Sequence, residues 1–121
     1  MDNRRKQQRR CPSAYYGVYD RTSEKLLGGL ADLTTEGLMI VGETPIDVTQ
    51  TIQAKLAMTK TILGSKEIFF TMTCVWCRQS EETKLYNAGF KIVNIAETEI
   101  AKIEQLLQRR SFAETVALHS D

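Results

Sequence analysis

Five basic residues crowd the first ten positions of the chain, and their spacing could hold a phosphate group. The segment reads Arg4-Arg5-Lys6-Gln7-Gln8-Arg9-Arg10, so Arg5 and Arg9 form an R-x-x-x-R arrangement. Arginine can pair with phosphate, form two hydrogen bonds to O6 and N7 of guanine, or stack on a base. Lys6 with Arg10 is a one-residue alternative, but lysine lacks the planar fork, so we prefer the all-arginine pair.

A second polar group, Asp32-Leu33-Thr34-Thr35-Glu36-Gly37, could contribute what arginines lack. The ionised carboxylate of Asp32 only accepts hydrogen bonds, so it suits the N1–H and N2–H₂ edge of guanine. The Thr34 hydroxyl can donate to phosphate or accept from a base. Gly37 can adopt a positive φ and let a ligand or backbone come close. With the arginines, this set is complementary to a guanine nucleotide and poorly matched to a metal or an acyl substrate.

Short segments of alternating polarity must position these groups. We expect strands over 13–20, 26–33 and 37–41, with Gly28 and Gly29 marking a bulge or a bend in the second. Three later segments alternate with period two, which predicts half-buried antiparallel strands in a small barrel or sandwich. Their apolar rows are Ile52, Ala54, Leu56 and Met58; Ile68, Phe70, Met72, Cys74 and Trp76; and Tyr86, Ala88, Phe90 and Ile92.

After the last strand the periodicity becomes helical. Ile100, Ile103, Leu106 and Leu107 predict one helix of about four turns that packs on the sheet. We therefore expect a flexible basic arm over residues 1–12, a single domain over 13–110, and over 111–121 a tail that is either loose or a frayed extension of the helix. No second domain is expected in 121 residues.

Composition and charge narrow the class of protein. The 42% hydrophobic content fits a folded globular chain, and no apolar run approaches the roughly 20 residues that span a bilayer. The net charge of +1 is unevenly distributed. Residues 1–10 hold five basic residues and Asp2, a net charge of +4, whereas the remainder holds 11 basic and 14 acidic residues, a net charge of −3. Positive charge confined to an arm favours a small anion over duplex DNA. We expect a cytoplasmic protein with no membrane contact.

In order and spacing, the two polar groups resemble the motifs of the PilZ domain, a cyclic di-GMP receptor module. Arg5 and Arg9 match the family's R-x-x-x-R, and Asp32, Thr34 and Gly37 match [DN]-x-S-x-x-G, with threonine in place of serine. The resemblance covers residues 4–110. It implies a mainly β fold, a six-stranded antiparallel barrel with a C-terminal α-helix. It also implies that these five residues bind cyclic di-GMP, with Arg4 and Arg10 as candidate additional contacts.

Other reactive residues carry weaker signals. Cys74 and Cys77 have the spacing of a metal pair, but on a regular strand residues three apart point to opposite faces, and no second pair completes four ligands. Trp76 is expected in the core, with a minor alternative in which its indole packs against a base. His119 is the only histidine, and no catalytic arrangement can be assembled around it. We expect neither an enzyme, nor a metal site, nor a cofactor other than the ligand.

Three functions follow from these observations. The first is a receptor whose arm becomes ordered when cyclic di-GMP binds, and which then signals to a downstream partner protein. The second is a PilZ-like adaptor that binds protein but no nucleotide. The third, single-stranded nucleic-acid binding, is ranked last because the barrel is net acidic outside the arm. Whether the chain is a monomer or a dimer stays open.

Overall fold

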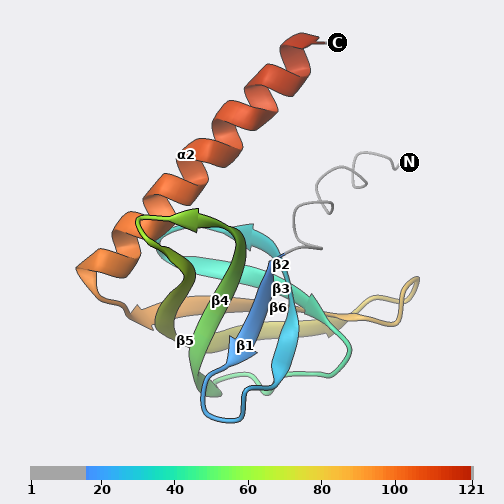
Figure 1. Ribbon diagram of the computed structural model, residues 1–121. Helices are drawn as coiled ribbons and strands as arrows, with labels where there is room; N and C mark the ends of the chain where they lie inside the picture. The colour runs from blue at the N-terminus through green and yellow to red at the C-terminus, as the bar shows by residue number, and fades with distance from the viewer. Residues whose placement is uncertain (1–15, 121) are drawn as a thin grey trace.

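Six antiparallel strands close into a barrel, and one helix follows them (Figure 1). The computed structural model describes residues 16–120. The order around the barrel is β1-β2-β3-β6-β5-β4, which confirms the predicted six-stranded barrel with a C-terminal helix. The elements are β1 (Gly17–Asp20), β2 (Leu26–Leu33), β3 (Gly37–Gly42), β4 (Thr51–Ile62), β5 (Ser65–Gln79), β6 (Tyr86–Asn94) and α2 (Glu97–Ser120).

The core follows from the alternation of the strands. Every second residue of β4 and of the first part of β5 points inward, and the barrel interior is filled by branched and sulfur-containing side chains. Burying each large side chain contributes roughly 1.5–3 kcal/mol, so this row of residues stabilises the closed sheet. The largest fully buried side chains include Ile40, Leu56, Ile62, Ile68, Met72, Ile103 and Leu106.

A bulge in β5 changes which residues face the core. Cys74 pairs with Phe90 and Trp76 with Gly89, so Val75 is an extra residue with no counterpart on β6. Beyond it the alternation is reversed. We predicted Trp76 in the core, but it lies on the outer wall. Cys77 packs against the core, on the same side as Cys74.

A second bulge lies in β2, where the register shifts between Leu30 and Asp32. Ala31 is the extra residue, and Asp32 is exposed while Leu30 and Leu33 are buried. On its other edge, toward β1, β2 also shifts register between Leu26 and Gly28, so an irregularity does lie directly beside the predicted Gly28 and Gly29. Gly28 has a different role, because a Cβ there would come within 2.5 Å of the Val41 carbonyl oxygen on β3.

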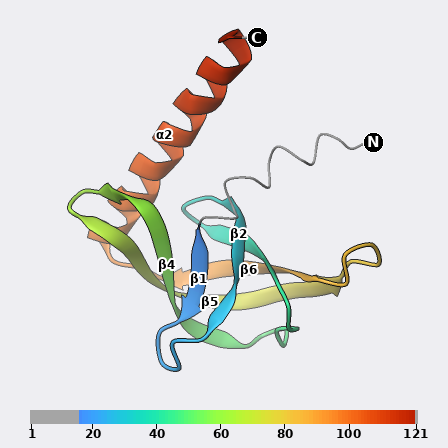
Figure 2. The ribbon, with the colours of Figure 1, turned by 45° about the vertical axis from the view of Figure 1, so that its right-hand side comes forward.

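Helix α2 is longer than predicted. Ile103 and Leu106 are buried against the barrel, as expected, and the helix continues to Ser120, so residues 111–120 extend the helix and do not form a loose tail. Its C-terminal half projects away from the strands in both views (Figures 1 and 2). No helix within residues 16–120 combines the length and the apolar character needed to cross a membrane.

Two side chains of α2 complete the hydrogen bonding of a free strand edge. Pairing between β5 and β6 begins only at Thr71, so the earlier part of β5 has no strand partner on that side. There the Phe69 N–H donates to Glu99 Oε1 over 2.9 Å, and Lys102 Nζ donates to the Glu67 carbonyl over 3.1 Å. Lys102 and Glu99 also pair with each other at 3.0 Å. The helix is therefore anchored by polar contacts as well as by apolar packing.

Candidate functional site

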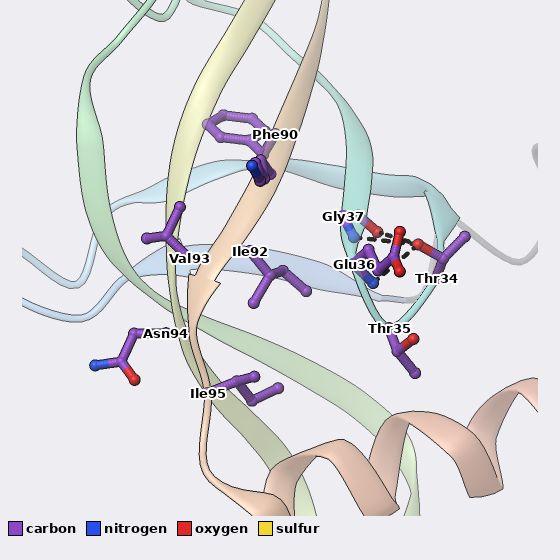
Figure 3. Close-up of a pocket in the computed structure, with 10 residues that line it drawn as sticks. Thr34, Thr35, Glu36, Gly37, Phe90, Ile92, Val93, Asn94 and Ile95 are labelled. Atoms are coloured by element: carbon purple, nitrogen blue, oxygen red, sulfur yellow. Dashed lines mark hydrogen bonds between the residues drawn. The ribbon is translucent and has the colours of Figure 1, made fainter.

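The hairpin between β2 and β3 uses the Thr34 side chain to hold its own shape. Thr34 Oγ1 accepts hydrogen bonds from the backbone N–H groups of Glu36 and Gly37, each over 3.1 Å, and donates to the Gly37 carbonyl over 3.3 Å (Figure 3). The Thr34 N–H reaches the same carbonyl at 2.9 Å. A threonine hydroxyl provides one donor and two acceptor positions, and the turn engages all three. Thr34 thus shapes the hairpin, and a serine could do the same.

Gly37 is explained by contact between strands. Its backbone is not in the left-handed region, so Gly37 does not use the positive φ that glycine can adopt. A Cβ at this position would lie 2.5 Å from the Phe90 carbonyl oxygen, closer than real side chains come. Only glycine therefore lets β3 approach β6 here, which is the close backbone approach that the sequence allowed.

Asp32 is the member of this motif whose side chain remains available. It is exposed on the outer wall, and its Oδ1 accepts a hydrogen bond from the adjacent Leu33 N–H at 2.9 Å. Among residues 16–108, this is the one hydrogen bond that the Asp32 side chain makes. The β2 bulge at Ala31 produces this orientation, and it leaves a carboxylate free to accept hydrogen bonds from a ligand.

Asp32 lies in one cross-strand row with Trp76. The row runs from Trp76 on β5 to Gly89 on β6, Met39 on β3 and Asp32 on β2. Neighbouring strands are about 4.8 Å apart, so the ends of the row are separated by about 14 Å. The indole of Trp76 lies over Gly89, and Asp32, Met39, Val75 and Trp76 line a hollow of about 370 Å³. An aromatic face and a carboxylate therefore flank one shallow depression.

Two cationic side chains adjoin this depression. Arg78 lies two residues beyond Trp76, and its Cζ is 5.4 Å from the centre of the indole ring. Lys91 is exposed in the next cross-strand row, opposite Gly37 and Thr73. Together with Asp32 and Trp76 they provide groups for a base and for phosphate on one wall.

A larger hollow, of about 880 Å³, lies on the other side of the hairpin. It separates the hairpin residues Thr34–Gly37 from the last part of β6, and Ile92 and Ile95 point into it while Val93 and Asn94 point away (Figure 3). Both hollows are lined by Thr34, Gly37 and Phe90. The wall around the hairpin is thus concave on both sides.

The chain enters the barrel beside this wall. The Leu30 N–H donates to the Tyr16 carbonyl over 2.8 Å, and Gly17 pairs with Gly29. Tyr16 therefore lies opposite Leu30, two residues from Asp32 along β2, and β1 begins opposite Gly29, three residues from it. The predicted contacts Arg4, Arg5, Arg9 and Arg10, and the alternative Lys6, lie outside the described residues, so their roles stay predictions.

Cys74 and Cys77 lie where their side chains pack within the fold. Cys74 is buried, and burial together with the neighbouring Cys77 raises the pKa of its thiol, which disfavours the reactive thiolate. Cys77 Sγ accepts a hydrogen bond from the Ile46 N–H at 3.5 Å. Across residues 16–120, no three side chains of the metal-ligating types gather into a metal site.

Sequence reasoning gave a minor role to Trp76 and did not identify Gly89, Arg78 or Lys91. The alternation of Trp76 and Arg78 places both on one face, which was a usable signal. The bulge that turns this face outward left no signal in the sequence, because no glycine or proline stands at or next to Val75.

Comparison with solved structures supports the fold. The inhibitor of motility MotI/DgrA of Bacillus subtilis superposes with a TM-score of 0.64 at 9% sequence identity, over 81% of this chain and 46% of that one. This chain thus spans less than half of that protein. A search of curated proteins finds no match.

Comparison with protein families identifies the chain directly. The PilZ domain matches residues 3–109, which include the basic segment, all six strands and the packed part of α2. PilZ domains form a family of cyclic di-GMP receptors and adaptors, and they are binding modules rather than enzymes. The chain belongs to the PilZ domain family.

Proposed function

We propose that this protein is a receptor that binds cyclic di-GMP on the outer wall formed by β2, β3, β6 and β5. The observation that carries the proposal is the row that joins the Asp32 carboxylate to the Trp76 indole. This row lies beside the point where the arginine-bearing segment enters the barrel at Tyr16. Family membership provides the ligand class, and the wall provides groups that fit it.

The wall is suited to a guanine base. The indole of Trp76 offers a stacking surface, and stacking of a base on an aromatic side chain contributes about 1–3 kcal/mol. The free carboxylate of Asp32 can accept from the N1–H and N2–H₂ groups of guanine. Adenine presents an acceptor at N1, so the same carboxylate disfavours adenine nucleotides.

The arm supplies the charge for the phosphates. Arg5 and Arg9 would clamp phosphate and base, with Arg4 and Arg10 as further contacts, while Thr34 and Gly37 keep the hairpin in shape beneath them. Ligand charge neutralises the arm, which becomes ordered over the wall. The combined surface of arm, ligand and barrel is then what a downstream partner protein recognises.

Calorimetric titration with cyclic di-GMP tests the proposal, with cyclic di-AMP and GTP as controls. We expect saturable binding of cyclic di-GMP and much weaker binding of both controls. If no heat or NMR shift accompanies cyclic di-GMP, the receptor function is wrong, and the nucleotide-independent adaptor takes its place.

The arginine pair is tested by single substitutions. Arg5→Ala and Arg9→Ala should each weaken binding by about 1.5–3 kcal/mol, because each removes charge-assisted hydrogen bonds. Lys6→Ala is the matched control and should cost less. A larger loss in Lys6→Ala than in Arg5→Ala would instead assign the clamp to Lys6 and Arg10.

A further inference from the structure

We propose that Gly89 is a positioning residue that holds the Trp76 indole flat against the barrel wall and so prepares the surface on which the base stacks. This inference rests on the proposed function and deepens it. Gly89 would touch no ligand itself. It would act through the orientation of the ring above it.

The space above Gly89 is filled by the indole. A Cβ at residue 89 would lie 2.1 Å from Trp76 Nε1, 2.5 Å from Cε2 and 2.8 Å from Cδ1, and these are its three nearest atoms. The φ of Gly89 is not in the left-handed region, so backbone conformation does not demand glycine here. The steric reason for the missing side chain is the tryptophan ring.

Other strand glycines of this barrel differ in that respect. A Cβ at Gly28, Gly37 or Gly42 would meet a backbone carbonyl oxygen at 2.2–2.5 Å. Those glycines allow two strands to approach each other, and replacing them strains the barrel. Gly89 instead accommodates one side chain, so its replacement should disturb the wall without disturbing the sheet.

The ring is restrained from two further directions. The bulge at Val75 turns Trp76 outward at the position opposite Gly89. The guanidinium of Arg78 lies 5.4 Å from the ring centre, within the range of a cation–π contact. A ring held in this way loses little conformational freedom when a base stacks on it, which favours affinity. A methyl group at residue 89 would push the indole off β6 and toward the space above Met39.

The test is a double-mutant cycle between Gly89→Ala and Trp76→Ala, with cyclic di-GMP as the titrated ligand. Gly89→Ala should weaken binding about tenfold in the native background and change it little in the Trp76→Ala background. Gly17→Ala is the matched control, because a Cβ there would also meet an aromatic ring, at 3.0 Å from Tyr19, on β1 and outside the row that joins Asp32 to Trp76. It should leave the affinity unchanged, and thermal unfolding checks that each variant folds.

Two results would overturn the inference. One is a Gly89→Ala variant that binds as the native protein does. The other is a Gly89→Ala loss of equal size with and without the tryptophan, which would mean that the glycine acts independently of the ring. If Trp76→Ala weakens binding while Gly89→Ala does not, the proposed function stands and only the positioning role fails.

Absence of any cyclic di-GMP binding would remove the proposed function, and fluorescence would then decide the positioning role. Trp76 is the only tryptophan of the chain, so its emission reports on this ring alone. Gly89→Ala should make the emission more accessible to acrylamide than it is in the native protein or in Gly17→Ala. Unchanged quenching would show that the ring has not moved and would overturn the inference.

Discussion

The two ends of strand β5 use polar and aromatic residues in opposite ways. In its first part, the free backbone groups of Glu67 and Phe69 are met by Lys102 and Glu99 of helix α2, whose side chains are only 11% and 13% exposed. In its last part, Trp76 and Asp32 line one hollow on the outer wall, and the Arg78 guanidinium lies 5.4 Å from the centre of the Trp76 ring. The first end has its hydrogen bonds completed within the fold, whereas the second leaves groups open to a ligand.

This contrast separates stability from recognition. Removing a partner from the anchored end leaves buried polar groups without hydrogen bonds, and that cost falls on folding. Removing a group from the open wall exposes nothing that was buried, so the cost should fall on binding alone. Substitutions at the two ends should therefore affect different measurements.

The largest effect is expected at the anchored end. Glu99→Ala should lower the free energy of unfolding by about 2–3 kcal/mol, because the Phe69 N–H loses its acceptor and the Lys102 ammonium loses its carboxylate and keeps only the Glu67 carbonyl. Denaturant unfolding measures this loss, and cyclic di-GMP affinity should not change. Glu104→Ala, an exposed carboxylate on the same helix, is the control. An equal loss in both variants would show that the contact with β5 is unimportant.

The pH dependence of stability is a second test of the contact between Glu99 and β5. Burial alone would raise the pKa of Glu99, but the hydrogen bond from the Phe69 N–H and the contacts with Lys102 hold it below its ordinary value of 4.5. A lowered pKa in the folded state means that the stabilisation is complete above pH 4.5 and is lost as the pH falls below it. The stability of Glu99→Gln should therefore fall less steeply with acid than that of the native protein.

At the open wall, Asp32→Ala should weaken cyclic di-GMP binding by about 2 kcal/mol, because charge-assisted hydrogen bonds to the base are lost. The free energy of unfolding should stay within about 0.5 kcal/mol of the native value, since Asp32 is exposed. Parallel calorimetry and denaturant unfolding decide between the two roles. A variant that unfolds easily would place Asp32 with the structural residues and weaken the contrast.

Thr34 shapes the hairpin and is also a predicted ligand contact, so it stands between stability and recognition. Its substitutions should have the smallest effects on both. Thr34→Ala removes the hydroxyl that closes the hairpin and should cost about 1 kcal/mol of stability. Thr34→Ser keeps the hydroxyl and should restore it. Binding by the serine variant should equal that of the native protein. A gain of binding in Thr34→Ser would mean that the threonine methyl group obstructs the ligand.

The fold was predictable because its signals are local. Period-two alternation in β4, β5 and β6 and helical spacing at Ile103 and Leu106 follow directly from burial on one face. The length of α2 was not predictable in the same way, because its second half projects away from the strands and residues 111–120 show no strong apolar periodicity in the sequence. Apolar periodicity arises where one face of an element is buried, so it does not mark how far a helix extends beyond the barrel.

The candidate site was predictable only in part. Asp32, Thr34 and Gly37 were identified from their spacing, and the structure shows that Thr34 and Gly37 shape the hairpin while Asp32 is exposed, so their contact with a ligand stays a prediction. Trp76 was assigned to the core because alternation was extended through Val75, where a bulge reverses it. Such a reversal depends on the pairing of β5 with β6, which no local pattern records.

Helix α2 is anchored to the barrel near its N-terminal end, so a small tilt there moves its C-terminal end by a larger distance. Its 24 residues correspond to a rod of about 36 Å, whose buried residues Lys102, Ile103 and Leu106 lie in the first half, while the second half projects away from the strands. A tilt of about 10° at the anchored base would displace the far end by about 6 Å, given that length. Because β5 carries both the Glu99 contact and the Trp76 wall, paired labels on the barrel and near Ser120 would convert small rearrangements of this strand into a measurable change of distance.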